Sequence, residues 1–133
     1  MSYNVFETHG RRVLEQGYPD YCFFKLSCQN NIDLIGVNKT RVMLVEIKST
    51  KYDVFYPCGD KRKREQWKGY FAKRKELMSK NIPCDIVLIV KVGYRNTSRI
   101  HIFTNIKKME DLPKSVRGFK EKKEVKNRVN KSK

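Results

Sequence analysis

Hydrophobic and polar positions along the chain form short apolar runs separated by polar turns. Five runs rich in Val, Ile, Leu or aromatic residues predict β-strands, at residues 21–26, 32–37, 42–48, 85–92 and 99–104. The polar sequence NKTR at 38–41 predicts a turn, so the second and third runs should form a hairpin. Pro57 and Gly59 interrupt the pattern, and we expect a loop or a short irregular strand between 52 and 60.

Two further segments carry apolar residues at helical spacing. In residues 3–16 these side chains gather on one face, and Gly17 and Pro19 then favour a stop. In residues 61–80 an apolar face that includes Trp67 lies opposite a stripe of Lys and Arg side chains. The order helix, three strands, helix, two strands predicts an α/β domain, with a central mixed β-sheet flanked by helices.

The charge of the chain distinguishes it from an ordinary small domain. Its 133 residues suffice for one domain, and they include 30 Lys and Arg against 14 Asp and Glu, for a net charge of +16. Such an excess favours a polyanionic partner, of which nucleic acid is the commonest. No apolar run reaches the roughly 18 residues that a membrane span needs, and residues 1–10 do not resemble a signal peptide. We therefore expect an intracellular, cytoplasmic protein with no membrane partner.

The composition shifts near the C-terminal end. Residues 114–133 hold nine Lys and Arg, two Glu and few apolar side chains. This pattern predicts a basic C-terminal tail that orders on a partner. The folded domain is then expected to comprise residues 1–113.

Acidic residues inside the predicted hairpin are the strongest functional signal. Folding the hairpin about its turn pairs residues 35 and 44, and it brings Asp33 opposite Glu46. Lys48 lies two residues beyond Glu46 and therefore points to the same face of the sheet. The sequence thus predicts two carboxylates and one ammonium group together at one end of the hairpin.

Two carboxylates this close repel each other, and a divalent cation bound between them removes the repulsion. Mg²⁺ prefers such oxygen ligands together with water and phosphate, and we expect Mn²⁺ to substitute for it. A cation of this kind generates hydroxide and stabilises the charge that develops on phosphorus. With Asp33 and Glu46 as metal ligands, Lys48 is expected to neutralise a phosphate oxygen or to orient the attacking water. This set predicts hydrolysis of phosphodiester bonds.

The segment from residue 32 to 51, which reads IDLIG and then MLVEIKSTK, resembles the motif of the PD-(D/E)xK nuclease superfamily. Within that superfamily it is most similar to the archaeal Holliday junction resolvases, and the likeness extends as a weaker pattern over residues 4–92. The resemblance implies a restriction-endonuclease-like core, with residues 1–113 as the nuclease domain. It also implies a Mg²⁺-dependent endonuclease that acts as a homodimer on branched DNA, in recombination and repair.

The resemblance further implies site residues outside the hairpin. The family has a metal-binding glutamate on its first helix, for which the candidates are Glu7 and Glu15. We prefer Glu7, because it lies at the edge of the apolar face, whereas Glu15 lies on the far side. Many members also carry a Gln on the helix after the Glu-x-Lys strand, which corresponds here to Gln66, with Tyr70 one turn later. Both are expected to address the metal-bound water or a phosphate.

Basic residues near the motif predict where a DNA backbone would bind. They lie in the loop after the hairpin and on both helices: Lys51, Lys61, Arg62, Lys63, Arg64, Arg11 and Arg12. Two alternatives to a junction resolvase stay open. One is another nuclease of the superfamily, of restriction, Mrr or RecB type, that cuts duplex or ends. The other is a nucleic-acid-binding protein without catalysis, against which the complete set of acids argues, because acids repel phosphate.

Overall fold

The central strand of the sheet, β3 (Val42–Thr50), is covered on both of its faces. The computed structural model describes residues 2–25, 32–93 and 99–118, without the side chains of residues 2–8. The Val, Leu and Ile content of β3 is typical of a strand buried on both sides, and residues 43–47 are all buried. β3 pairs with β2 (Leu34–Val37) in antiparallel fashion, and Ile35 lies opposite Leu44. The predicted hairpin and its register are confirmed.

The sheet has five strands in the order β1–β2–β3–β5–β6. β1 (Cys22–Phe24) and β6 (Arg99–Phe103) form its two edges, and β5 (Cys84–Val92) lies beside β3. β5 runs parallel to β3, whereas the other neighbouring pairs are antiparallel. A parallel pair needs a crossover connection, and α2 (Lys61–Ser79) lies within it.

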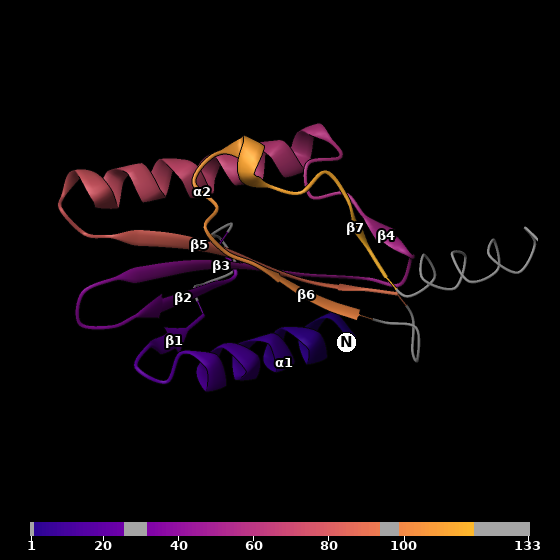
Figure 1. Ribbon diagram of the computed structural model, residues 1–133, viewed down its shortest axis with the longest axis horizontal. Coiled ribbons are helices and arrows are strands. Elements are labelled where there is room, and N and C mark those ends of the chain that lie inside the picture. Colours follow the sequence, from indigo (N-terminus) through magenta and orange to yellow (C-terminus); the bar gives the residue numbers. More distant parts are fainter. Residues whose placement is uncertain (1, 26–31, 94–98, 119–133) are drawn as a thin grey trace, which may run out of the picture.

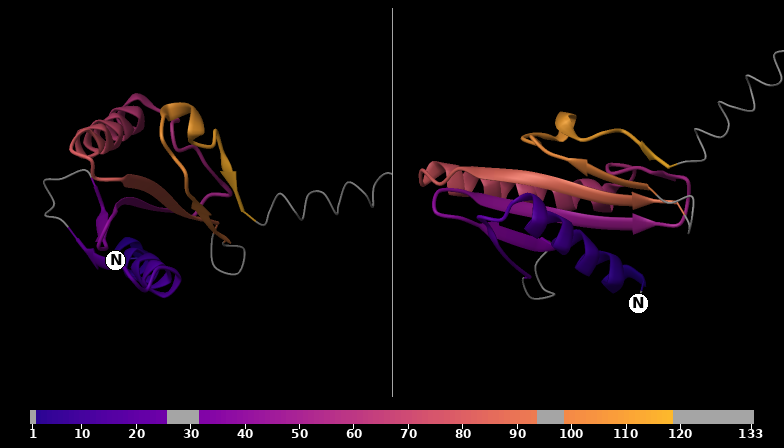
Figure 2. Two further views of the ribbon diagram at one scale, coloured as in Figure 1. Left: turned by 60° about the vertical axis from the view of Figure 1, so that its left-hand side comes forward. Right: turned by 60° about the horizontal axis from the view of Figure 1, so that its bottom comes forward.

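The two helices cover opposite faces of this sheet (Figures 1 and 2). α1 (Ser2–Gly17) covers one face, where Leu14 and Val45 belong to the same buried cluster. α2 covers the other face, where Tyr70 and Leu44 belong to a second buried cluster. Since successive side chains of a strand point to opposite faces, the even-numbered positions of β3 face α2. The predicted fold class, α/β with a mixed sheet flanked by helices, is confirmed.

α1 continues without a break through Gly10, which is buried. A Cβ atom at this position would lie 3.4 Å from Ile47 Cδ1 of β3. A methyl group would fit there in ordinary contact, whereas a larger side chain would be crowded against the central strand.

α2 begins directly after the loop that contains Pro57 and Gly59. Asp60 caps the helix, because its side chain accepts a hydrogen bond from the Lys63 N–H at 2.8 Å. Further along, the Trp67 Nε1–H donates to the Pro57 carbonyl at 3.2 Å. These contacts hold the loop against the first two turns of α2.

Three short elements complete the fold, and the first of them lies within residues 52–60, where a loop or a short irregular strand is expected. β4 (Val54–Phe55) pairs with β7 (Val116–Arg117) in a separate two-stranded sheet, and a 3₁₀ turn, η2, spans Met109–Asp111. Val116 is buried, so the folded part of the chain continues past residue 113 and includes the first residues that the sequence assigns to the tail. The rest of that segment, residues 119–133, lies outside the described residues, and its role stays a prediction.

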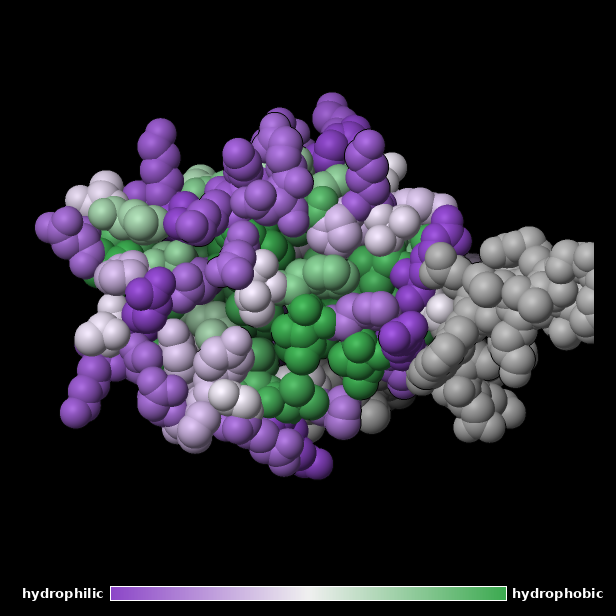
Figure 3. All heavy atoms as spheres, in the orientation of Figure 1, coloured by the Kyte–Doolittle hydropathy of each residue, from purple (hydrophilic) through white to green (hydrophobic). Residues whose placement is uncertain are grey.

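Polar and apolar side chains are unevenly distributed over the face seen in Figure 3. Hydrophilic side chains gather over α2, while hydrophobic ones gather over the edge strand β6, where Ile100 and Ile102 are 40% and 45% exposed. Within the described ranges, no helix has an apolar stretch long enough to cross a membrane.

Candidate active site

Asp33 lies directly before β2, at the open end of the hairpin. Its Oδ2 accepts a hydrogen bond from the Ile47 backbone N–H at 2.8 Å, so the side chain reaches across to β3. The last observed pair at this end is Leu34 with Val45. One further step in the same register places Asp33 opposite Glu46, as the turn position predicts.

Glu46 is a buried carboxylate, with only 1% of the residue exposed. Its Oε1 accepts hydrogen bonds from the Tyr70 hydroxyl and from Gln66 Nε2, the latter at 3.3 Å. Its Oε2 lies 2.9 Å from Lys48 Nζ. Beyond this ion pair, Oε2 has no partner among the described residues. A buried carboxylate oxygen with a lone pair still available is suited to one more ligand.

Tyr70 of α2 connects the residues of the hairpin to one another. Its hydroxyl accepts a hydrogen bond from the Asp33 backbone N–H at 3.3 Å. The same hydroxyl lies 3.1 Å from the Val45 carbonyl oxygen and also contacts Glu46 Oε1, and its single proton can serve only one of these acceptors. Burial, and then the nearby Glu46 charge, raise the pKa of Tyr70 well above its ordinary value of 10.0, so the hydroxyl stays protonated. Tyr70 therefore fixes the position of Glu46 relative to Asp33.

The pKa of Glu46 is raised from 4.5 to about 7. Loss of solvent is the largest cause, and the negative charge of Asp33 adds to it, while Lys48 acts in the opposite direction. Two neighbouring carboxylates and a single ammonium group therefore leave an excess of negative charge in a dry environment. A cation bound beside them would lower this pKa again.

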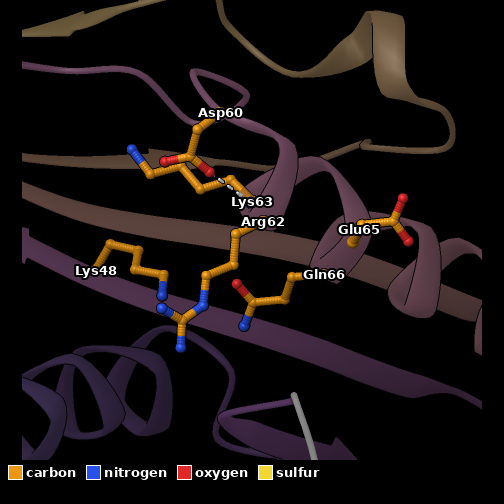
Figure 4. A pocket seen from close by; sticks show the side chains of 6 residues that line it. All are labelled: Lys48, Asp60, Arg62, Lys63, Glu65 and Gln66. Atoms are coloured by element: carbon orange, nitrogen blue, oxygen red, sulfur yellow. Dashed lines mark hydrogen bonds between the residues drawn. The ribbon is translucent and has the colours of Figure 1, made fainter.

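An open pocket of about 630 Å³ adjoins these residues (Figure 4). Its lining side chains come from β3 and from the start of α2: Lys48, Asp60, Arg62, Lys63, Glu65 and Gln66. Glu46 does not line the pocket, but it contacts Lys48 and Gln66, which do. In Figure 4 the polar ends of Lys48, Arg62 and Gln66 point to the same side, whereas the Lys63 ammonium is directed away from them. The pocket can therefore receive an anion beside the buried carboxylates.

Whether a divalent cation suits this site can be judged from its donor atoms. Asp33 and Glu46 offer carboxylate oxygens, and Glu46 Oε2 is buried without a hydrogen bond from the described residues. These are the hard oxygen ligands that Mg²⁺ prefers, and one or two carboxylates with water and phosphate are its usual set. Among the residues whose side chains are described, no group of three His, Cys, Asp or Glu side chains is close enough to hold a metal. The site therefore fits a cation held by two carboxylates and completed by other oxygen donors.

The predicted residues of the first helix are not all brought to this site. Glu7 lies on α1, but its side chain is outside the description, so its metal-binding role stays a prediction. The N-terminal end of α1 and the C-terminal end of β3 do lie toward the same end of the molecule (Figures 1 and 2). Glu15 is exposed and pairs with Arg11 at 3.3 Å, while Arg11 Nη2 also donates to the Phe23 carbonyl at 2.5 Å. Arg12 is exposed.

The basic residues predicted to contact DNA are divided between the pocket and its surroundings. Arg62 and Lys63 line the pocket. Arg64 donates to the Cys58 carbonyl at 3.1 Å, and Lys61 is exposed in the first turn of α2. Lys51 is exposed as well, at the end of β3. Of these predicted DNA contacts, only Arg62 and Lys63 line the pocket beside the carboxylates.

Sequence reasoning missed two acids of the pocket, Asp60 and Glu65. Asp60 did carry a signal, because an Asp directly before a helical pattern is typical of a helix cap. Glu65 carried none, since it is one of many charged residues on an exposed helix face. Both reduce the positive charge of the pocket and limit how many phosphates it can hold.

Comparisons with known proteins find only a weak structural likeness. No family model matches the chain, and no curated protein does. Among solved structures, the chain is similar to Hjc of Archaeoglobus fulgidus, a Holliday junction resolvase from an archaeal hyperthermophile. The identity is 14%, the match covers 68% of this chain and 73% of that chain, and the TM-score is 0.38. A likeness at this level assigns no role to any residue.

Proposed function

We propose that the protein is a metal-dependent, structure-specific endodeoxyribonuclease, and that it hydrolyses phosphodiester bonds at four-way DNA (Holliday) junctions. The observation that carries the proposal is the convergence of Asp33, Glu46 and Lys48 at one end of the hairpin. Glu46 Oε2 gives this convergence its chemical meaning, because it is a buried carboxylate oxygen whose one contact among the described residues is Lys48, and it keeps a lone pair for a metal.

In the proposed site Asp33 and Glu46 hold Mg²⁺, for which Mn²⁺ substitutes, and Glu7 is the candidate for a third ligand. When bound, the metal supplies an activated water and neutralises the charge that develops on the phosphate. Tyr70 and Gln66 hold the Glu46 carboxylate in place through Oε1, and they leave Oε2 for the metal. Glu46 and Lys48 thus sit on the central strand, and Asp33 is held to it by the Ile47 N–H, which keeps their positions fixed.

Lys48 has a separate task in this proposal. Its ammonium group lies 2.9 Å from Glu46 Oε2 and its side chain is 32% exposed, so Lys48 connects the buried carboxylate to the open pocket. There it can donate to a non-bridging phosphate oxygen or orient the attacking water. Arg62 and Lys63 add positive charge that positions the DNA backbone without reading its sequence.

The choice of substrate is the finer part of the proposal. A net charge of +16 on 133 residues supports nucleic acid as the partner. Symmetric cleavage of a four-way junction needs two active sites, and a homodimer related by a two-fold axis supplies them. The motif from residue 32 to 51 is the reason to prefer a junction over linear duplex.

A cleavage assay on labelled four-way junction, linear duplex, single strand and flap, each with Mg²⁺, Mn²⁺ or EDTA, tests the proposal. Paired symmetric nicks in the junction, with metal and not with EDTA, are the expected result. Cleavage of the other substrates would move the protein to another branch of the superfamily. Binding without cleavage under every metal would instead leave a non-catalytic DNA-binding protein.

Variants then test the residues. Asp33→Asn and Glu46→Gln should abolish cleavage and leave DNA binding equal or tighter, because each removes a negative charge from the phosphate site. Asp85→Asn and Glu76→Gln are matched controls, since Asp85 pairs with Arg41 at 2.9 Å and Glu76 pairs with Lys73 at 2.9 Å on exposed surfaces. The site assignment is wrong if Glu46→Gln and Glu76→Gln cut at the same rate.

A further inference from the structure

A second hollow adjoins the pocket that Lys48, Arg62 and Gln66 line, which we call the catalytic pocket. Its volume is about 570 Å³, and Lys63 lines both it and the catalytic pocket. The end of β3, the loop after it and β4 form its walls, which include Tyr52, Phe55 and Tyr56. Tyr52 is 68% exposed and Tyr56 is 48% exposed. Large aromatic side chains with this exposure form a surface that a flat apolar ligand can cover.

The backbone around this hollow is held in place. The Tyr56 carbonyl accepts two hydrogen bonds, from the Gly59 N–H at 3.1 Å and from Lys63 Nζ at 3.0 Å. A Cβ atom at Gly59 would lie 2.8 Å from Tyr56 Cβ, so a side chain there would displace the tyrosine. On the other side of the hollow, β4 pairs with β7, and the Gly118 N–H donates to the Asp53 carbonyl at 2.9 Å. The aromatic surface is thus built on a fixed frame.

Lysine ammonium groups lie close to the aromatic rings. Lys63 Nζ lies 4.6 Å from the centre of the Phe55 ring, and Lys51 Nζ lies 5.9 Å from the centre of the Tyr52 ring. Among the described residues that line the hollow there is a lysine and no acid. Aromatic faces next to lysines are how proteins bind single-stranded nucleic acid: the bases stack on the rings while the cations attract the backbone.

We infer that the hollow formed by Tyr52, Phe55, Tyr56 and Lys63 binds an unpaired nucleobase of DNA, next to the phosphate in the catalytic pocket. The inference rests on the proposed function, because that function supplies the phosphate site in the catalytic pocket. An apolar peptide is a poorer match than a base, since the net charge of +16 and the two flanking lysines favour an anionic ligand.

This base site gives the enzyme a physical means of selecting its substrate. In continuous duplex each base is stacked between its neighbours and cannot reach a protein ring without unstacking, which costs energy. At a branch point or in a single strand a base is available at a much lower cost. The base site therefore favours DNA that is interrupted beside the bond to be cut.

Binding of two single strands of equal charge by the full chain, in EDTA, tests the inference. One strand is oligothymidylate of about ten nucleotides, and the other is an abasic deoxyribose phosphate of the same length. The wild type should bind the thymidylate more tightly. The double variant Tyr52→Ala/Tyr56→Ala should weaken thymidylate binding by about five- to hundredfold, with little change in abasic binding. The double Tyr→Phe variant should keep the preference, and so should the control Phe24→Ala, an exposed aromatic residue of β1.

Equal affinity of the wild type for the two strands would overturn the inference, as would an equal loss for both strands in the double Ala variant. The measurement uses no metal and no cleavage, so its outcome is separate from that of the junction assay. A base preference without nuclease activity would keep the base site and remove the proposed function. Nuclease activity without a base preference would remove the base site and keep the proposed function.

Discussion

At the scale of single residues, Glu46 has two properties that oppose its proposed role as a metal ligand. It is almost completely buried, and it lies beside a second carboxylate, Asp33. In the folded protein both features favour the protonated form of Glu46. A metal ligand must be ionised, so metal binding has to remove the proton that the metal-free protein favours on Glu46.

This opposition predicts how stability depends on pH without metal. Because the pKa of Glu46 is 4.5 ordinarily and about 7 in the folded protein, the folded state holds this proton more tightly than the unfolded chain. The stabilisation that this proton gives the folded state is therefore complete below pH 4.5, and it is lost as the pH rises to about 7. Glu46→Gln should be more stable than the wild type above that pH, by on the order of 3 kcal/mol, and the difference should shrink toward acid pH.

Denaturant unfolding of both proteins in EDTA, across this pH range, measures the difference. Glu76→Gln is the control, because Lys73 lowers the pKa of Glu76 and the dependence on pH should have the opposite sign. Saturating Mg²⁺ should reverse the order of the wild type and Glu46→Gln, since a ligand that binds only the folded state stabilises it. A pH-independent difference in EDTA would contradict the raised pKa.

The residues of the site differ in how far the sequence could reveal them. Asp33, Glu46 and Lys48 follow from the position of one turn, because strand register fixes which side chains share a face. The bridging contacts of Tyr70 do not follow from any local pattern. They depend on how α2 docks against the sheet, and this position is set by the whole core. For Tyr70, the sequence predicted a contact with the metal-bound water or a phosphate, whereas the described contacts of its hydroxyl are with Glu46 and with the backbone of Asp33 and Val45.

At the scale of elements, Gly10 and Gly69 are helix glycines in opposite surroundings. Gly10 of α1 is buried against Ile47, whereas a Cβ atom at Gly69 of α2 would meet nothing within 4 Å. Ala at either position should stabilise the protein, by up to about 1 kcal/mol, because glycine is a poor helix former. A leucine at each position should distinguish the two surroundings. Gly10→Leu should destabilise by about 1–3 kcal/mol through overpacking, whereas Gly69→Leu should be close to Gly69→Ala.

Thermal unfolding of the four variants checks this comparison. If Gly10→Leu were as stable as Gly69→Leu, α1 would have to lie further from β3 than the structure places it.

The longer elements were predictable, whereas of the shortest only β4 lies where a short strand was one of the expected alternatives. The hairpin and α2 have apolar patterns that extend over many residues, so their local signals are strong. β4 and β7 have two residues each and come from distant parts of the chain, so neither carries a pattern of its own. Their pairing depends on Val116, which becomes buried only in the complete fold.

At the scale of the whole molecule, the charge of the C-terminal segment should affect DNA binding. Residues 119–133 carry seven Lys and Arg and two Glu. Removing them by a stop after Gly118 should weaken DNA binding and make its dependence on salt shallower, because fewer counterions are released. Affinity measured over a series of salt concentrations gives both quantities. An unchanged slope would mean that the segment does not contact DNA.

The position of the stop matters for this experiment. A stop after Pro113 would also remove β7 and its buried Val116, so it would change the fold together with the charge. A comparison of the two truncated chains separates these effects. The shorter chain should show a lower free energy of unfolding, and the longer one should match the full chain.

β3 has one antiparallel and one parallel partner, and this arrangement implies an order of events during folding. Its hairpin with β2 closes over a short turn, whereas its pairing with β5 joins Val42 to Cys84 across the whole of α2. Since longer loops cost more entropy to close, the hairpin should form first and bring Asp33 and Glu46 together in water. There the solvent screens their repulsion. Only when α2 docks does Tyr70 reach the pair and exclude the water, so the burial of charge is a late step of folding.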